Sequence, residues 1–454
     1  MRPHALLPLL LAVLALAPAL PADAVSSGIV ATPPAVPAAG SALSLPQALA
    51  IAGDKNPELR KLQLAADAAG WKKLGAFASQ VPHVDIKATH FLDAEYGKLS
   101  VVFGGAKIAF PEAFPQTEVD VEASWLLFDG FQALGGYQAG TLEAEAAELE
   151  LKHARGHLDQ AVRVRFYKAL AAQELVKVAE QDITTLEQHA SLADASEQAG
   201  FATRVDVLRI GSQLEEARAG KLLADDNAAL ARRDLDQVLG AQPDGRALDG
   251  TLPVPDAARV PATLSLDPTQ REDYAALQCR REALEQAQSA SVASLWAPKL
   301  ALFGAKQFYK FGNFDPAILP NDGFQESYAY GFRASWSLFD GGADWARYEQ
   351  AKDAVGQSVE SLRRLALASA DAFEAAKRHY LYNCALYQAR LRSVEKSQES
   401  VRLATLGVQA GSQTHAQALD AELDLFRAKA GVIQAQVGAA ESLAELEQAL
   451  GRSL

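Results

Sequence analysis

The chain has 454 residues, 49% of them apolar, and a formal net charge of −13 at neutral pH. This length allows two or three ordinary domains and a sizeable core. The acidic balance argues against a nucleic-acid-binding protein, because such proteins present a basic face to the phosphate backbone.

The N-terminus has the pattern of a secretory signal peptide. Arg2 precedes an apolar run at 6–16, and the sequence ADA at 22–24 fits a small-x-small cleavage site. The run is too short and too closely flanked by proline for a transmembrane helix. We therefore expect a cleaved signal peptide at 1–24 and a disordered Pro/Ala/Ser leader at 25–42. The signal peptide predicts export to the bacterial periplasmic side. Since no cysteine directly follows the cleavage site, we expect no lipidation at a cysteine.

One apolar octet is written twice in the chain. It reads ASWLLFDG at 123–130 and ASWSLFDG at 334–341, an offset of 211 residues (334 − 123). The same offset continues downstream and aligns the QAG sequence at 198–200 with the QAG sequence at 409–411. A repeat this long is an internal duplication and not a short-period solenoid. We expect a first repeat at 43–240, a linker rich in Gly, Pro and Asp at 241–267, and a second repeat at 268–454.

The first repeat is expected to begin with a helix at 45–79, broken near Pro57. Two runs of alternating apolar and polar residues follow at 84–89 and 119–127, separated by a loop at 92–117. Alternation with period two predicts strands with one apolar and one polar face.

The second repeat shows the same alternation at 328–338, after a loop at 309–327. After each octet the period changes. Residues 131–196 contain no proline, and apolar residues recur every seven positions, which predicts coiled-coil packing. At 1.5 Å per residue this helix would be about 90–100 Å long. A second long helix returns after the segment around Gly200, and likewise after Gly411.

Each octet is expected to mark a junction where a strand ends and a long helix begins. Asp is a good helix N-cap, Gly allows the chain to turn, and Trp favours the interface between a bilayer and water. The alternative is a soluble strand–turn–helix with Trp in a core. The residues concerned are Trp125, Asp129 and Gly130 in the first copy and Trp336, Asp340 and Gly341 in the second.

Two strands per repeat give four per chain, which is too few to close a barrel, and open sheet edges are not tolerated in lipid. Membrane barrels start at about eight strands. We therefore expect the chain to associate, and three copies would supply twelve strands.

Five stretches, taken together in their order along the chain, resemble the outer-membrane factor family, the TolC-type channels of tripartite efflux pumps and type I secretion systems. They are LSLPQALAIAGDKNPELR (43–60), the two octets, QAGFATRVDVLRIGSQLEEAR (198–218) and QAGSQTHAQALDAELDLFRAK (409–429). The resemblance covers nearly all of the mature chain. No single stretch is very specific, but their order in duplicate is.

The resemblance implies a mainly α-helical fold with a membrane β-barrel part, in which long antiparallel coiled-coil helices and four β-strands per chain close in a homotrimer as a 12-stranded barrel and an α-helical tunnel. It implies a passive conduit in the lipid of the bacterial cell outer membrane, with a large periplasmic part. The implied partners are a periplasmic adaptor (membrane fusion) protein and an inner-membrane pump of RND, ABC or MFS type. The substrate stays open, since a drug, a metal ion, a polysaccharide or a protein would all fit.

Two sets of site residues follow from the resemblance. The helical-hairpin tips would dock the adaptor; a plain helix-to-helix turn is the alternative. A ring of acidic residues would narrow the tunnel near the tip and favour cations, at Asp420 with Gln417 beside it and Asp206 in the first copy. Gln417 departs from the family's acidic pattern, and Asp420 can equally be a solvated carboxylate. The tip residues are Gly200, Phe201, Thr203, Gly411, Ser412 and Thr414.

The sequence offers little chemistry beyond this. His153 and His157 are four apart on a helix, but they lack a third metal ligand and are expected to be solvated, so we expect no metal site and no cofactor. No catalytic motif is present, and we expect no enzyme. Cys279 and Cys384 can form a disulfide in an exported protein or be two buried thiols. The competing function is a non-transporting coiled-coil structural or adhesive protein of the periplasm or cell surface, which would not explain the amphipathic strands.

Overall fold

The computed structural model describes residues 42–92, 98–111, 115–200, 203–243, 245–261, 263–311, 323–410 and 412–454. The expected signal peptide, and the expected leader up to residue 41, lie outside the described residues. Contacts group the described residues into two compact units, each built from both repeats. The first unit holds residues 68–144 and 279–358, and the second holds residues up to 67, 145–278 and 359–454.

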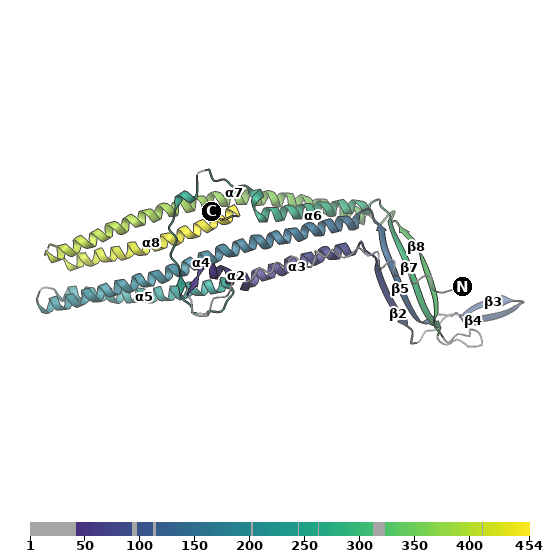
Figure 1. Ribbon diagram of the computed structural model, residues 1–454, viewed down its shortest axis with the longest axis horizontal. Helices are drawn as coiled ribbons and strands as arrows, with labels where there is room; N and C mark the ends of the chain where they lie inside the picture. Colours follow the sequence, from purple (N-terminus) through teal and green to yellow (C-terminus); the bar gives the residue numbers. More distant parts are fainter. Residues whose placement is uncertain are drawn as a thin grey trace. The chain divides into compact units, whose positions relative to one another are not determined.

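The first unit contains a four-stranded antiparallel sheet. Its strands are β2 (His83–His90), β5 (Pro115–Phe128), β7 (Lys299–Phe311) and β8 (Gln325–Ser335). They lie side by side in the order β2-β5-β7-β8 (Figure 1). The central β5–β7 pair therefore joins the first repeat to the second. The expected alternation holds on the first pair, since the register puts Ile86 opposite Val121 and Lys87 opposite Asp120.

One expectation about the first repeat was wrong. We expected residues 92–117 to be a loop, but they contain a hairpin of β3 (Lys98–Phe103) and β4 (Ala106–Pro111). The two residues between the strands, Gly104 and Gly105, have φ of 58° and 87°. A two-residue turn with positive φ at both positions matches the twist of a hairpin, and a Gly-Gly pair allows it without strain.

The long helices are present in both repeats and have equal lengths. Helices α4 (Gln132–Gln198) and α7 (Ala343–Gln409) each have 67 residues, and α5 (Arg204–Leu239) and α8 (His415–Leu450) each have 36. In the second unit α5 folds back along α4, and α8 along α7 (Figure 1). The seven-residue rows face inward, as shown by buried Val162 and Ala169 on α4. The expected coiled-coil helices are therefore confirmed.

The expected helix at 45–79 is divided where the sequence predicts a break. Helix α2 (Leu45–Lys55) ends before α3 (Pro57–Ala78), and α6 (Glu272–Ser294) stands at the corresponding place in the second repeat. The Asn56 side chain lies between α2 and α3. Its Oδ1 accepts hydrogen bonds from the backbone N–H groups of Glu58 and Leu59, so it caps α3.

The expected linker at 241–267 is packed against the helices of the second unit. Strand β6 (Leu248–Asp249) pairs in parallel with β1 (Leu43–Ser44), and two 3₁₀ turns follow at Ala257–Arg259 and Pro268–Gln270. The Val260 side chain is buried in a cluster with Phe373 and Tyr380. The Tyr380 hydroxyl donates a hydrogen bond of 2.9 Å to the Asp256 carbonyl. A segment rich in Gly and Pro is thus ordered by a few well-spaced apolar residues.

Cys384 is buried and Cys279 is partly buried, and among the described residues neither forms a disulfide. Within the residues that the structure describes, no helix combines the length and the apolar character needed to cross a bilayer.

Candidate functional site

The first helical tip joins α4 to α5 and is closed by a reciprocal cap. The Thr203 hydroxyl oxygen accepts a hydrogen bond from the Asp206 backbone N–H at 3.3 Å. The Asp206 carboxylate in turn accepts from the Thr203 backbone N–H at 3.1 Å and from its hydroxyl at 2.7 Å. An ion pair between Arg204 and Glu197 at 3.2 Å ties the two helix ends together. Gly200 lies in the turn, and Phe201 lies outside the described residues.

The second tip has the same cap 211 residues later. The Thr414 hydroxyl accepts from the Gln417 backbone N–H at 3.3 Å, and Gln417 Oε1 accepts from the Thr414 backbone N–H at 3.0 Å. The Ser412 backbone N–H donates to the Gly407 carbonyl at 2.8 Å, which closes the turn. Gly411 lies outside the described residues.

These caps give two of the three expected constriction residues a structural role. Asp206 and Gln417 both stand third after the capping threonine and bind back to it. The T-x-x-D and T-x-x-Q spacings are capping boxes that the sequence displays and that our reading of it missed. Asp420, one turn further along α8, is exposed, and within the described residues it forms no hydrogen bond or ion pair. Its place in a constriction stays a prediction, as does adaptor docking at the tips.

We expect Thr203→Ala and Thr414→Ala each to destabilise its own helix start by about 1 kcal/mol, the usual loss for an N-cap. The check is hydrogen exchange of the tip peptides, in which each variant should lose protection only at its own tip. Loss of protection at both tips from one substitution would contradict the independence of the caps.

The two tips should respond differently to acid. The hydrogen bonds that Asp206 accepts from the Thr203 hydroxyl, and then from its backbone N–H, lower the pKa of this carboxyl. The contribution of Asp206 to the stability of the first tip is therefore present above the pKa that this carboxyl has in the unfolded chain. It is lost as the pH falls through the pKa in the folded state. Gln417 does not titrate, so the second tip provides the internal control. Below the range of about pH 5 to 8 in which histidines change charge, a further fall in pH through the folded pKa of Asp206 should loosen the first tip alone.

The strand-to-helix junctions also share their local chemistry. Asp129 Oδ2 accepts a hydrogen bond of 2.7 Å from the Ala133 backbone N–H, and Asp340 Oδ2 accepts one of 2.7 Å from the Asp344 backbone N–H. Each carboxylate thus satisfies an N–H in the first turn of its long helix and places a negative charge at the positive end of the helix dipole. The following glycine has φ of 74° in both copies.

The surroundings of the two junctions differ. In the first copy Gly130 is buried against Ala293 and Ala297, and the Trp125 indole N–H donates to the Gln80 carbonyl at 2.9 Å. In the second copy no atom of the described residues lies within 4 Å of a Cβ built on Gly341, and Trp336 is 57% exposed.

We expected Trp336 to lie within a strand, and this was wrong. Strand β8 ends at Ser335 because its partner β7 begins at Lys299, the residue opposite Ser335. Strand β5, by contrast, stays paired with β7 through Trp125, opposite Leu302, to Phe128, opposite Leu300. A membrane-interface position for the two tryptophans stays a prediction.

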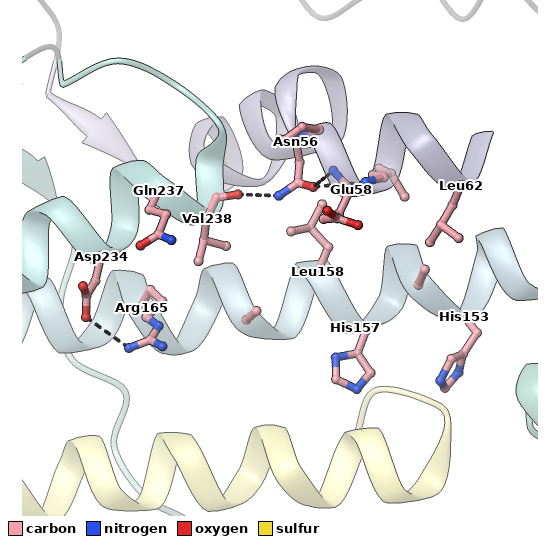
Figure 2. A pocket seen from close by; sticks show the side chains of 14 residues that line it. Asn56, Glu58, Leu62, His153, His157, Leu158, Arg165, Asp234, Gln237 and Val238 are labelled. Carbon is pink, nitrogen blue, oxygen red and sulfur yellow. Dashed lines mark hydrogen bonds and ion pairs between the residues drawn. The ribbon is translucent and has the colours of Figure 1, made fainter. Parts of the chain in front are cut away.

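A cavity of about 670 Å³ in the second unit is lined by Asn56 and by residues of α3, α4 and α5 (Figure 2). Asn56 Nδ2 donates to the Val238 carbonyl at 2.8 Å, and Arg165 pairs with Asp234 at 3.2 Å. The two histidine rings point away from α2 and α3 (Figure 2). Burial, and then the charge of His153, lowers the pKa of His157, whose ring contacts the Gln448 side chain. Among the described residues, no three His, Cys, Asp or Glu side chains gather as a metal site.

The duplicated helices, the two capped tips and the four-stranded sheet can be compared with known proteins. The sequence matches the family of outer membrane efflux proteins over residues 48–241 and 269–452. The chain belongs to the outer membrane efflux protein family. The resemblance to TolC-type channels is therefore confirmed.

Individual relatives of this efflux protein are distant. Protein CyaE of Bordetella pertussis is 32% identical over 128 residues, which are 27% of this chain and only 26% of CyaE. Among solved structures, CusC has a TM-score of 0.75 at 16% identity and covers 90% of this chain and 92% of its own. The outer membrane protein VceC of Vibrio cholerae has a TM-score of 0.72 at 17% identity, with 90% and 96% covered. These likenesses show the fold.

Proposed function

We propose that three copies of this chain form a channel in the bacterial outer membrane, exported by a cleaved signal peptide at 1–24. The channel would be the passive outer segment of a tripartite efflux pump or a type I secretion system. Membership in the outer membrane efflux protein family supports export over a structural coiled-coil role. The observation that carries the assembly is the unequal covering of the two junctions, whose octets differ at one position only.

Repeat symmetry identifies the missing cover. Within one chain the first octet packs against Ala293 and Ala297, which belong to the second repeat. The Val81-Pro82 pair aligns with Ala297-Pro298, so the equivalent cover for the second octet comes from a first repeat. In the single chain this cover is missing, and Leu338 and Phe339 are 79% and 88% exposed. The first repeat of a neighbouring copy would bury them.

The edges of the four-stranded sheet also support contact between neighbouring copies. Among the described strands, β2 and β8 each have one neighbour, so each leaves one edge free. Pairing β8 of one copy with β2 of the next is a head-to-tail contact, which forms a ring when the rotation between successive copies closes. A ring also removes the open edges that lipid does not tolerate. Three copies of four strands give the even-numbered barrel that outer-membrane proteins use.

The remaining parts of the proposal concern partners. The capped tips would meet a periplasmic adaptor, and an inner-membrane pump would supply the energy. Both tips are built alike, so an adaptor with repeated contacts could engage the two repeats of each chain in the same way. The substrate would be set by the pump.

Mass measurement of the protein in detergent tests the assembly. We expect a trimer for the wild type and a folded monomer for Gly341→Leu, because the leucine would occupy the place of the neighbouring copy while its Cβ would meet none of the described residues of its own chain. The left-handed backbone at Gly341 costs any side chain about 1 kcal/mol, a loss that Gly341→Ala shares. Gly341→Ala, which adds one methyl group, is the milder comparison. A wild-type monomer, or a Gly341→Leu trimer, would contradict the proposed ring.

Planar-bilayer conductance tests the conduit and the constriction. We expect discrete channels with cation preference for the wild type, and a weaker preference or a larger conductance for Asp420→Ala, because a ring of three carboxylates would be lost. Asp424→Ala, one turn further along α8, is the matched control and should behave as wild type. Channels indifferent to Asp420→Ala would discard the constriction and keep the channel, whereas an inserted trimer without conductance would argue against an open conduit.

A further inference from the structure

The polar contacts between α4 and α8 follow one antiparallel register. Arg163 lies 3.5 Å from Glu447, Lys168 lies 2.7 Å from Glu441, and the His189 ring lies 2.8 Å from Glu422. Between the first and last pair, α4 advances by 26 residues (189 − 163) and α8 by 25 (447 − 422). The two helices therefore stay in step over about 39 Å at 1.5 Å per residue. We call this line of contacts the α4–α8 seam.

The pair nearest the tips is the one that can lose its charge. Arginine and lysine remain protonated at every physiological pH, so the first two pairs of the seam are permanent. Histidine changes charge between about pH 5 and 8. The His189 ring therefore decides whether the seam carries an ion pair at its end near the tips.

The charge of His189 lies in a partly buried environment beside a carboxylate. The side chains of His189 and Glu422 are only 25% and 16% exposed. Glu422 Oε2 is buried and, among the described residues, has no hydrogen-bond partner. It lines a cavity of about 440 Å³ formed by α4, α5 and α8. A carboxylate held this far from water depends on its one cationic partner.

Charged side chains from α4, α5 and α8 line the cavity. The carboxylates are Asp182 on α4, Glu216 on α5 and Glu422 on α8, all of which line the cavity. The permanent cations on α8 are Arg427, which lines the cavity, and Lys429, whose charge acts on Asp182. Arg427 also pairs with the exposed Asp424 at 3.8 Å, so its charge is shared with a fourth carboxylate. Carboxylates therefore outnumber the permanent cations, and protonation of His189 adds a positive charge beside Glu422.

Two groups of the cluster, His189 and Asp182, both have a raised pKa. The hydrogen bond with Glu422 raises the pKa of His189 against the opposing effect of burial. Burial, and then the charge of Glu422, raises the pKa of Asp182. The packed seam therefore holds protons more tightly than the separated helices would. The stabilisation by His189 is fully present below its unfolded pKa and is lost as the pH rises through its folded pKa.

We propose that the contact between His189 and Glu422 is a proton-dependent clasp, which holds the hairpin of the first repeat to that of the second near the tips while the histidine is protonated and loosens when it is neutral. The clasp does not depend on the proposed channel. If the channel is as proposed, the clasp makes the grip between the two hairpins respond to the acidity of the periplasm.

Hydrogen exchange of the full-length protein in detergent, compared at about pH 5.5 and about pH 8 after correction for intrinsic rates, tests the clasp. In the wild type, peptides covering 182–198 and 415–429 should be about three- to tenfold more protected at the acidic pH, the effect of half to one unit of pKa shift. His189→Gln should remove this difference and show, at both pH values, the lower protection that the wild type has at about pH 8. His189→Lys, a permanent cation, should also remove it and show, at both pH values, the higher protection that the wild type has at about pH 5.5.

Two controls separate the clasp from general effects. His415→Gln changes the other histidine near the tips, at the start of α8, and should leave the pH difference unchanged. Glu441→Gln breaks the Lys168 pair of the same seam and should lower protection equally at both pH values. A wild type without a pH difference, or a difference that persists in His189→Gln, would overturn the proposal. Exchange of peptides from 145–165 shows whether each variant is folded.

Discussion

Gly240→Ala will destabilise the helical unit by about 2–4 kcal/mol, whereas Gly451→Ala, the same change one repeat later, will cost about 1–2 kcal/mol. Both glycines end a 36-residue helix, with φ of 67° and 72°. An alanine at either place pays about 1 kcal/mol for a left-handed backbone. The difference between them arises from what the new methyl group would meet.

At Gly240 the new Cβ would lie 2.6 Å from the Lys55 carbonyl oxygen and 3.0 Å from the Asn56 Cα. These are backbone atoms at the break between α2 and α3, and they cannot move without disturbing the cap that Asn56 forms. At Gly451 the nearest atom is the Arg271 Cγ at 3.1 Å, which belongs to a side chain. Denaturant unfolding followed by helical circular dichroism measures both variants. Equal losses would show that the backbone conformation alone matters.

Phe166→Ala should cost about 3–5 kcal/mol, the usual loss for a fully buried phenylalanine. Its side chain is 1% exposed and lies in a cluster that joins α2, α4 and α5 and includes Leu43 and Leu239. Removing the ring would leave a cavity where these elements meet, so the ends of α2 and α5 should exchange hydrogen faster as well.

Phe166→Leu is the graded control for this prediction. It keeps an apolar side chain and should cost about 1–1.5 kcal/mol in the same denaturant titration. Two variants of equal stability would mean that the cluster tolerates a cavity and that the ring contributes little.

Much of the fold could be predicted because its signals are local. A period-two pattern marks a strand wherever it occurs, and a proline-free stretch with seven-residue rows marks a coiled-coil helix. The hairpin at 98–111 was missed although Gly104-Gly105 is a turn signal, because the loop was judged by its glycine, proline and phenylalanine content. The cap at each tip was equally readable, since Thr203 and Thr414 both stand three residues before a capping side chain.

For the candidate sites, the positions of the residues could be predicted but their contact partners could not. Their positions along the chain followed from the duplication and from the family resemblance. Their partners did not, because a residue such as His189 meets Glu422, which lies 233 positions further along the chain. No local pattern specifies a contact at that separation.

By itself the sequence determined the duplication, the order of helices and strands in each repeat, and the family. These depend on periodicity, propensity and repeated spacing, which are written along the chain. The tertiary structure alone decided that the octet at 123–130 is covered while its copy at 334–341 is bare, and that Asp206 and Gln417 bind back to their caps. It also decided that residues 241–267 pack against the helices. Nearly identical octets have different surroundings because packing depends on which surfaces the fold brings together, and one chain supplies a partner to only one of the two copies.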